Sequence, residues 1–428
     1  MKKILVAGAG IGGLVAAANL AKNGFDVTLL EKQNRDSIGH DWLDTMLKSA
    51  FEESGIPCPD SSVFSPQHNV CFHNPNKSMS LTAPENTDNS AAYIDRKFLS
   101  AYLIDYAEKC GAELRFGVNI RKAVTKNSRI VGVETDTEVI DCDLLIDSAG
   151  LDSPARKSLP DESGVRKELK ESEIFSAYRA YYENITDETS EPRYNIYFFH
   201  CGNGGMDWVI KEKGFTDILV GNFTPLNEQK IKAATEDFFK DYPNMGRKIV
   251  RGGYCAQIPL RRTLPVIVWN GYAAVGDSAV MVEPMSGSGI SLSMKAGKIL
   301  ADTVTKAVDY SKESLWNYQY RYFNELGNSQ LSSDIMKNCL ASMTAEDIDY
   351  LFEKKILTNA ELAAQGATKY TVTEFLAKGV NLCLRPRLIM PFIRAFASIA
   401  KIGKTLKLMP EEYSKEQIDI WAKEYEKL

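Results

Sequence analysis

Three glycines and one acidic residue near the start of the chain have the types and spacing of a dinucleotide-binding turn. Gly8, Gly10 and Gly13 follow a short apolar run, and Glu31 comes 21 residues after Gly10. In such a turn the backbone approaches a pyrophosphate, which lies at the N-terminus of the following helix, where free N–H groups favour negative charge. A carboxylate about 20 residues further on accepts hydrogen bonds from the adenosine ribose. Because an acidic residue disfavours a 2′-phosphate, the pattern predicts FAD or NAD rather than NADP.

The same stretch predicts the elements that position these residues. Residues 4–7 are apolar and predict a buried strand, the residues after the glycines continue as an apolar helix, and residues 27–31 predict a second strand that ends at the acid. This strand, turn, helix and strand order makes the glycine pattern far more specific than its glycines alone. We expect Ile11 and Gly12 in the turn, and Lys32 directly after the acid, to contact the cofactor as well.

A second Gly-rich segment lies far along the chain. Gly276 and Asp277 end an apolar strand, and residues 284–289 form a turn before another helix. A carboxylate at a strand end can hold ribityl hydroxyls, and a Gly-rich turn that opens a helix places N–H groups beside a flavin ring or its phosphates. The two segments suit one extended dinucleotide, and together they predict FAD. In the second turn the residues expected to contact it are Pro284, Gly287, Ser288, Gly289 and Ile290.

Composition excludes several other classes of protein. The 428 residues carry a formal net charge of −5, which argues against general affinity for nucleic acid. Eight cysteines have no CxxC spacing and the four histidines do not pair with them at zinc-ligand spacing, so we expect reduced thiols and no metal site. The chain enters its first strand directly after Met1-Lys2-Lys3 and has no apolar run long enough to span a bilayer, so we expect a cytoplasmic protein.

The order of apolar runs and helical patterns predicts an α/β fold in three parts. A helix is expected over residues 41–54, an antiparallel meander over residues 112–142, and a helix break at Pro391. The expected parts are a Rossmann-like FAD-binding domain (1–70, 90–170 and 260–310), a β-sheet substrate domain (70–90 and 171–259) and a helical C-terminal region (311–428).

Four segments resemble the flavoprotein superfamily of p-hydroxybenzoate hydroxylase and, within it, the geranylgeranyl reductase family. They are residues 8–31, Arg96 after a Tyr-Ile-Asp run, residues 147–156, and Gly276-Asp277 with residues 284–289. The resemblance runs from residue 1 to about residue 300. It implies that the acid of the first segment, Arg96 and the aspartate of the last segment contact FAD, and that the last turn lies beside the isoalloxazine.

The residues expected around the substrate depart from that family. Residues 204–211 are similar to a motif of the substrate domain in these reductases, but only Trp208 is kept in type, and it would line the cavity above the flavin or serve as a core aromatic residue. His200 and Cys201 come just before this segment, and either is a candidate proton donor or a packing residue. The aspartate that the family usually has in the turn after residue 147 is Ala149 here.

The loop after Glu31 departs from the family in the same way. The reductases often carry a cysteine there, and this chain has none between Asp36 and Leu43. His40 and Asp41 are candidates to face the flavin, and the alternative for each is a surface or capping role.

Residues 384–408 form a basic amphipathic stretch in an otherwise acidic chain. They contain six basic residues and no acidic one, interspersed with apolar residues. Such a stretch can rest on an anionic bilayer and deliver a lipid substrate. The alternative is a helical pair that packs on the core and turns a basic face outward.

Together these features predict a FAD-dependent oxidoreductase that reduces C=C bonds of an apolar, isoprenoid or lipid-like substrate by hydride transfer from flavin N5. One alternative is a flavin-dependent monooxygenase that hydroxylates an aromatic or other small substrate. Another is a flavin-binding protein of the membrane surface without catalysis. The expected partners are the apolar substrate, an electron donor such as NAD(P)H or ferredoxin, and a membrane surface contacted peripherally through residues 384–408.

Overall fold

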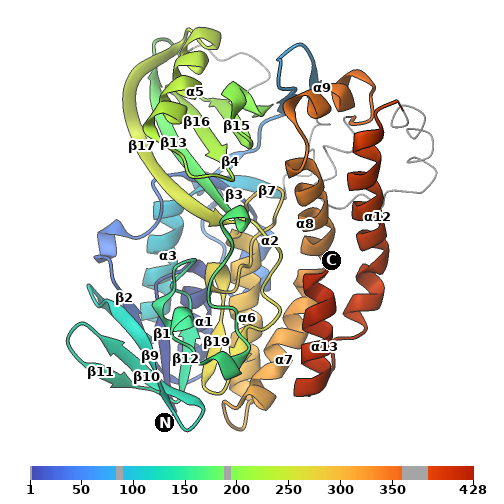
Figure 1. Cartoon of the computed structure of the whole chain (residues 1–428). Coiled ribbons are helices and arrows are strands. Elements are labelled where there is room, and N and C mark those ends of the chain that lie inside the picture. The colour runs from blue at the N-terminus through green and yellow to red at the C-terminus, as the bar shows by residue number, and fades with distance from the viewer. Residues whose placement is uncertain (1, 83–89, 188–193, 359–383) are drawn as a thin grey trace.

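The computed structural model describes residues 2–82, 90–187, 194–358 and 384–428, and most of its strands belong to two sheets (Figure 1). In the first sheet, β1 pairs in parallel with both β2 and β12, and β12 pairs in parallel with β19. The carboxyl ends of these strands therefore meet at one edge. In spatial order the six strands are β18 (Val268–Trp269), β19 (Tyr272–Ala274), β12 (Leu144–Asp147), β1 (Lys3–Ala7), β2 (Asp26–Glu31) and β8 (Glu113–Phe116).

Three helices cover one face of this sheet. α1 (Ile11–Lys22) connects β1 to β2 and packs against both α3 (Arg96–Lys109) and α6 (Ile290–Lys306). α1 is buried from Ile11 to Leu20, as its almost wholly apolar sequence requires. The contact with α6 is close, because a Cβ added at Gly297 would lie 2.4 Å from the Gly12 carbonyl oxygen.

A three-stranded antiparallel meander follows β8, which confirms the prediction over residues 120–141. The start of the predicted meander is wrong, because residues 113–116 form β8 and pair in parallel with β2. β9 (Ile120–Lys126), β10 (Arg129–Thr135) and β11 (Val139–Asp141) pair antiparallel in chain order. The α/β fold class predicted from the sequence is confirmed by these sheets and helices.

The second large sheet has seven strands and carries α5 (Glu228–Asp241) on one face (Figure 1). Adjacent strands are antiparallel except for β14 and β5, which run parallel. In spatial order the strands are β17 (Met245–Pro259), β13 (Ile174–Asn184), β16 (Phe215–Asn222), β15 (Met206–Lys211), β14 (Tyr194–Phe198), β5 (Val70–His73) and β6 (Ser80–Thr82).

A small sheet lies between the two large ones, and it corrects one prediction. The helix expected over residues 41–54 is wrong: the segment forms β3 (Leu43–Leu47) followed by the short helix α2 (Ser49–Glu53). β3 pairs antiparallel with β7 (Ala91–Asp95), which also pairs with β4 (Phe64–Pro66). Pairing with a strand some 50 residues away decides the conformation here, and no local pattern reveals such a partner.

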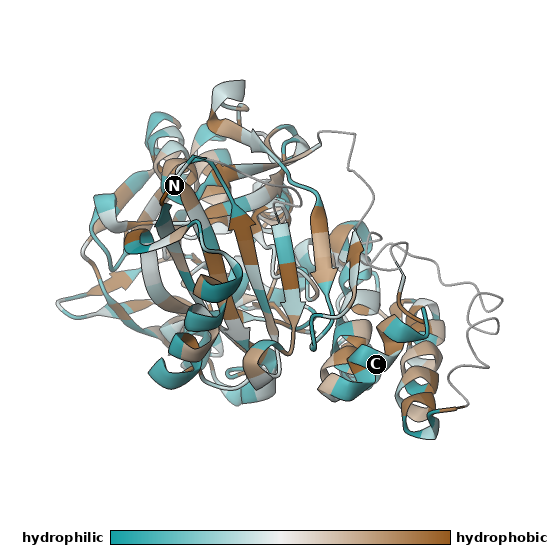
Figure 2. Ribbon diagram, turned by 90° about the horizontal axis from the view of Figure 1, so that it is seen from above, coloured by the Kyte–Doolittle hydropathy of each residue, from teal (hydrophilic) through white to brown (hydrophobic). Residues whose placement is uncertain are grey.

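The C-terminal helices lie side by side along the two sheets (Figure 1). The predicted break at Pro391 is wrong, because α12 continues through it while Leu388, Phe392 and Ala395 pack into the core. Seen from above, hydrophobic residues gather in the central strands and hydrophilic residues on outward turns of helices (Figure 2). The helices are α7 (Lys312–Tyr322), α8 (Asn328–Ala341), α9 (Ala345–Glu353), α12 (Pro386–Leu406) and α13 (Lys415–Glu426).

None of the helices in the described parts of the chain is both long enough and apolar enough to cross a membrane.

Candidate functional site

The two predicted Gly-rich turns open two neighbouring helices. Gly10 is the N-cap residue of α1 and Gly289 is that of α6, and neither glycine has a side chain that could cap the first N–H groups. The helix starts pack together, because a Cβ added at Gly12 would lie 3.0 Å from the Ser293 carbonyl oxygen. Two neighbouring helix N-termini attract phosphate oxygens through their positive dipole ends and through the first-turn N–H groups that have no partner in the helix.

Glu31 lies beside the first of these turns, as its spacing predicts. Its carboxylate accepts a hydrogen bond from the backbone N–H of Ala9 at 2.8 Å and another from that of Gln33 at 2.8 Å. Gly8, between β1 and this contact, has a φ of +88° that favours glycine. Lys32, the residue after the acid, is exposed. The structure thus brings the acid at the end of β2 next to the turn at the end of β1.

Ser148, which the sequence analysis did not single out, lies directly beneath the first turn. Its Oγ accepts a hydrogen bond from the Gly13 N–H at 3.1 Å. A Cβ added at Gly10 would lie 2.4 Å from Ser148 Oγ, and one at Gly13 would lie 2.5 Å from Ser148 Cβ. Close packing against the end of β12 therefore requires glycine at both positions, independently of any ligand.

Asp147 joins the turn after β12 to the turn after β19. It is buried and accepts hydrogen bonds from the hydroxyls of Ser153 at 2.6 Å, Tyr272 at 2.8 Å and Ser278 at 2.9 Å. Its Oδ1 also accepts from the Ala149 N–H at 3.1 Å, so the turn keeps its backbone contact although the family's aspartate is absent. This network was missed because its members come from two distant stretches of the chain, residues 147–153 and 272–278.

Arg96 and Asp277 face the same space as the two helix starts. Arg96 begins α3 and donates through Nη1 to Asp44 Oδ2 at 2.9 Å, while its buried Nε has no hydrogen-bond partner among the described residues. Asp277 is exposed, yet neighbouring protein atoms desolvate its carboxyl and raise its pKa, and the charges of Arg96 and Arg156 oppose that rise. A Cβ at Gly289 would lie 3.8 Å from Asp277 Oδ1, so the second turn lies against this carboxylate.

The loop before β3 forms an aromatic stack. The His40 ring lies 4.5 Å from that of Trp42, and Tyr254 from β17 continues the stack at 5.5 Å from Trp42. Burial, with a further contribution from the charge of Arg96, lowers the pKa of His40 to about 4, so its imidazole is neutral at physiological pH. The Asp41 N–H donates to Tyr254 Oη at 2.8 Å, which ties this loop to the second sheet.

A buried guanidinium group holds the same loop from below. Arg179 on β13 donates to Asp217 Oδ2 at 2.6 Å, to Asp44 Oδ1 at 2.7 Å and to the Leu43 carbonyl oxygen at 2.6 Å. Burial favours a higher pKa for Asp44, but the charges of Arg179 and Arg96 outweigh it and lower that pKa. Asp44 thus connects Arg96 to the second sheet. No spacing pattern surrounds a single arginine in a strand, so the sequence carries no signal for this role.

Comparisons with known proteins agree with this architecture. The model of the NAD(P)-binding Rossmann-like domain family matches residues 6–42. The digeranylgeranylglycerophospholipid reductase of Sulfolobus acidocaldarius is 23% identical over 442 aligned residues, covering 98% of this chain and 96% of that protein. The reductase of the same name from Methanosarcina acetivorans is 28% identical and covers 81% of this chain and 87% of its own.

A solved structure of a geranylgeranyl bacteriochlorophyll reductase-like protein from Thermoplasma acidophilum superposes with a TM-score of 0.72 at 19% identity, covering 92% of this chain and all of that one. The chain is therefore similar, in sequence along most of its length and in fold, to geranylgeranyl reductase-like flavoproteins. PqsL of Pseudomonas aeruginosa has a TM-score of 0.61 at 15% identity, which shows a shared fold alone. The predicted resemblance to these reductases, and the prediction of an enzyme that works with a flavin, are confirmed.

The three catalytic candidates lie on opposite faces of the second sheet. Trp208 points toward Arg179, whose guanidinium carbon lies 5.4 Å from its ring centre. The neighbouring Asp207 and Val209 point to the α5 face, as strand alternation requires. His200 and Cys201 lie on that α5 face, so the structure does not bring them together with Arg96 and Asp277.

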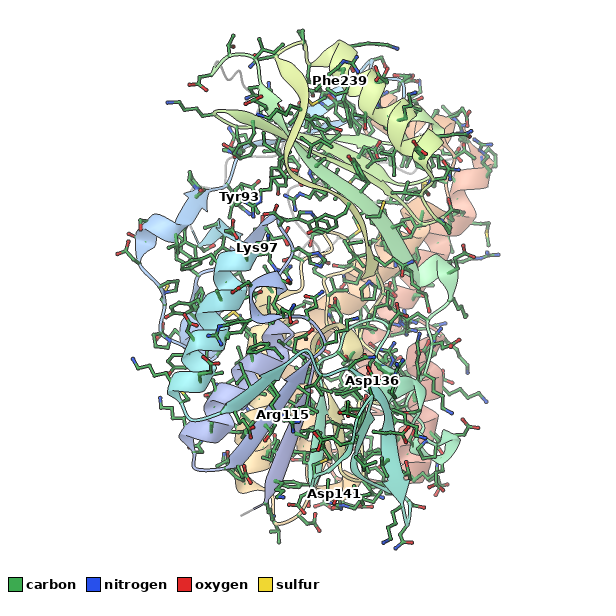
Figure 3. The ribbon with its side chains drawn as sticks, turned by 90° about the vertical axis from the view of Figure 1, so that its left-hand side faces the viewer. Tyr93, Lys97, Arg115, Asp136, Asp141 and Phe239 are labelled. Atoms are coloured by element: carbon green, nitrogen blue, oxygen red, sulfur yellow. The ribbon has the colours of Figure 1, made fainter. Side chains whose placement is uncertain are left out.

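A small cavity of about 10 Å³, roughly the room that one water molecule needs, lies beside Arg179, between the small sheet and the seven-stranded sheet. Trp208 Nε1 is buried near it without a hydrogen-bond partner in the described part of the chain. Figure 3 shows Tyr93 and Lys97 near the junction of the two sheets, and Phe239 of α5 at the far end of the molecule. The residues that line the cavity are Leu43, Tyr93, Arg179, Ile210, Glu212, Phe215 and Asp217.

Proposed function

We propose that this oxidoreductase binds FAD and reduces C=C bonds in the prenyl chains of a lipid. The observation that carries the proposal is a convergence of groups: two helix starts with glycine at the N-cap, the Nε of Arg96, which has no partner among the described residues, and the exposed carboxylate of Asp277. These groups fit the cofactor chemically, because N–H groups bind the pyrophosphate and a carboxylate binds hydroxyl groups. When bound and reduced, the flavin would supply a hydride to one alkene carbon, and the other carbon would take a proton from water or a side chain of the cavity.

We assign the two halves of the cofactor to the two turns. Gly8, Gly10 and Glu31 hold the adenosine half, with Ile11, Gly12, Gly13 and Lys32 completing that turn. Arg96 and the N-termini of α1 and α6 hold the pyrophosphate, and Asp277 holds the ribityl hydroxyls. The flavin ring lies against the second turn, whose contacting residues are Gly276, Pro284, Gly287, Ser288, Gly289 and Ile290.

The seven-stranded sheet then forms the substrate side, in line with the three-part division of the chain. Trp208 and the stacked pair His40 and Trp42 are flat apolar surfaces that exclude water, and Arg179 fixes the loop that carries them. His40 is neutral there and places no charge beside an alkene.

The substrate class follows from the relatives, which are named for digeranylgeranylglycerophospholipids, and from one helix of this chain. α12 buries Leu388 and Phe392 and exposes Met390, Ile393 and a row of basic residues on its outer side. An amphipathic helix of this kind binds anionic membranes, where such a substrate resides. We propose that it docks the enzyme peripherally on the bilayer.

Flavin content tests the cofactor assignment. The wild-type protein is expected to purify yellow with FAD released on denaturation, and D277A to bind FAD at least about tenfold more weakly because it loses a charge-assisted hydrogen bond. The exposed aspartate variant D187A, far from both turns, is the matched control and keeps its FAD. A wild-type protein that rejects FAD, or a D277A variant that binds it like D187A, contradicts the assignment.

Reaction products test the activity. The FAD-loaded enzyme, reduced without oxygen, is incubated with a digeranylgeranyl glycerophospholipid, and mass spectrometry measures the addition of hydrogen to its double bonds. Product that appears only with O₂ and contains an added oxygen atom would instead identify a monooxygenase. FAD binding without any product identifies a non-catalytic flavoprotein. NADPH, NADH and reduced ferredoxin are then compared as electron donors by the rate of flavin reduction.

Liposome flotation tests the membrane contact. The variant R394Q/K401Q/K404Q removes three exposed charges from α12, and at about 1 kcal/mol per basic residue it binds anionic liposomes about 100-fold more weakly. The control K22Q/K109Q/K126Q removes three exposed charges elsewhere and leaves binding unchanged. Equal losses in both variants, or binding of the wild type that does not respond to salt, contradict the role of α12.

A further inference from the structure

Three side chains with metal-binding atoms converge on the α5 face of the seven-stranded sheet, away from the proposed flavin site. They are His200, Cys201 and Asp237, whose ligand atoms all lie within 4.8 Å of one another. His200 Nε2 is 3.6 Å from Cys201 Sγ and 2.9 Å from Asp237 Oδ2. Around a tetrahedral zinc ion, neighbouring nitrogen and sulfur ligands lie about 3.6 Å apart, so only the carboxylate must shift slightly.

The histidine of this cluster is oriented as metal-binding histidines are. Its Nδ1 is 2.8 Å from Asp207 Oδ2, and Asp207 is buried and accepts a second hydrogen bond from the Gly221 N–H at 2.9 Å. The Phe238 ring stacks on the imidazole at 4.4 Å. A carboxylate on one ring nitrogen fixes the tautomer and leaves the other nitrogen as the metal ligand.

The backbone of this turn is strained so that adjacent side chains meet. Phe199 and Cys201 have φ values of 53° and 51°, in the left-handed region that residues other than glycine rarely adopt. Consecutive side chains normally diverge, and this conformation brings the Cys201 thiol back to the imidazole of the preceding residue. Strain of this kind persists where the surrounding structure overdetermines it, often at ligand sites.

Charge in the cluster favours a divalent cation. The carboxylates of Asp207, Asp237 and Asp241 surround it, and the one cation that contacts them in the described chain is Lys77, which is bonded to Asp237 and Asp241. The three carboxylates therefore outnumber the lysine that contacts them. Lys77 can keep its contact with Asp241 while Asp237 turns one oxygen to a metal ion. Cys201 is exposed, which leaves a path from solvent.

We propose that His200 Nε2, Cys201 Sγ and an Asp237 oxygen bind a zinc ion, with water as the fourth ligand. Binding displaces the thiol proton to solvent, so Cys201 ligates as a thiolate and no oxidation occurs. Mixed nitrogen, sulfur and oxygen ligands in tetrahedral arrangement suit zinc better than magnesium or calcium. The ion clamps the turn at residues 200–202 to α5, and its function is to hold this face of the sheet together.

Cobalt substitution in the full-length protein tests the site. The chelator-treated wild type is expected to bind one Co²⁺ per chain, with intense visible absorption from a tetrahedral ion and a near-ultraviolet thiolate band. C201S loses the thiolate band, and C255S, which removes another exposed cysteine, keeps it. Zinc measured by mass spectrometry in protein purified without chelator is expected at one ion per chain and falls in C201S.

Two results overturn the proposal. One is the absence of a stoichiometric Co²⁺ complex in the wild type, and the other is a thiolate band that survives in C201S. Because Cys201 is exposed, the serine variant is expected to fold, and its circular dichroism spectrum and FAD content are compared with those of C255S. If both variants lose FAD, that result tests the proposed flavin site and not the zinc site, and the metal content of the two variants can still be compared.

Discussion

The two faces of the seven-stranded sheet both bury charge, but they use it differently. On the face toward β3, Arg179 donates through Nε, Nη1 and Nη2 to Asp217, Asp44 and a carbonyl oxygen. On the face toward α5, three carboxylates surround His200 and Lys77, and a thiol lies beside them. In the first cluster each guanidinium nitrogen of Arg179 has an acceptor, and the cluster joins the seven-stranded sheet to the segment that contains β3. The second has negative charge in excess, which is the property that a cation requires.

The largest expected effect on stability comes from removing Arg179 from the first cluster. R179M leaves Asp217 buried without a cationic partner, and removal of one member of a buried ion pair costs about 3–5 kcal/mol of unfolding free energy. Urea unfolding monitored by fluorescence measures the loss. R247M, which breaks the exposed pair between Arg247 and Glu236, is the control and is expected to cost below about 1 kcal/mol.

The double variant R179M/D217L separates the two sources of that cost. It removes both buried charges of the pair, while Asp44 keeps its contact with Arg96. Replacement of a whole buried pair by apolar groups is often close to neutral, so the double variant is expected to recover most of the stability. If R179M lowers the free energy of unfolding no more than R247M does, the contacts of Arg179 do not hold these two parts of the protein together.

A smaller effect on the same face is a pH dependence from His40. Its pKa is about 4 in the folded protein and 6.5 for an unperturbed histidine, so between these values the unfolded chain binds the proton more readily. The contribution of neutral His40 to the free energy of unfolding is therefore complete above pH 6.5 and is lost as the pH falls toward 4. From pH 7 to pH 5 the wild type is expected to lose about 2 kcal/mol more than H40N, measured by urea unfolding without flavin. Parallel pH profiles contradict this.

The smallest effect is expected on the α5 face, and it depends on zinc. D207N leaves one hydrogen bond of the buried carboxylate unmade, which costs about 1 kcal/mol in zinc-free protein. Because Asp207 orients the metal ligand, the same variant is expected to weaken Co²⁺ binding about 10–100-fold. The stability gained on adding zinc to the wild type is then reduced in D207N. An equal gain in both proteins shows that Asp207 does not support a metal ligand.

Much of the cofactor side was predictable, because its features are local in sequence. A glycine turn between an apolar strand and an apolar helix, followed by an acid at the end of the next strand, specifies one βαβ unit within residues 3–31. Asp277 was selected from its place at a strand end, and Arg96 through a resemblance rather than through spacing. Ser148 and Asp147 lie in a segment that carries the resemblance, but the contacts they make were not predicted. The latter act by packing and hydrogen bonding between turns that are distant in the chain.

The sequence by itself determined that successive side chains of a strand point to opposite faces of the sheet. It did not determine which other elements each of those two faces would contact. Tertiary structure decided that Trp208 points toward Arg179 while Asp207 points toward α5, and that Asp237 on α5 reaches His200. It also decided that residues 43–47 form a strand, because β7 supplies the hydrogen-bonding partner. The physical reason is the same in each case: local patterns specify backbone conformation, whereas charge clusters and strand pairing depend on partners brought near only by the completed fold.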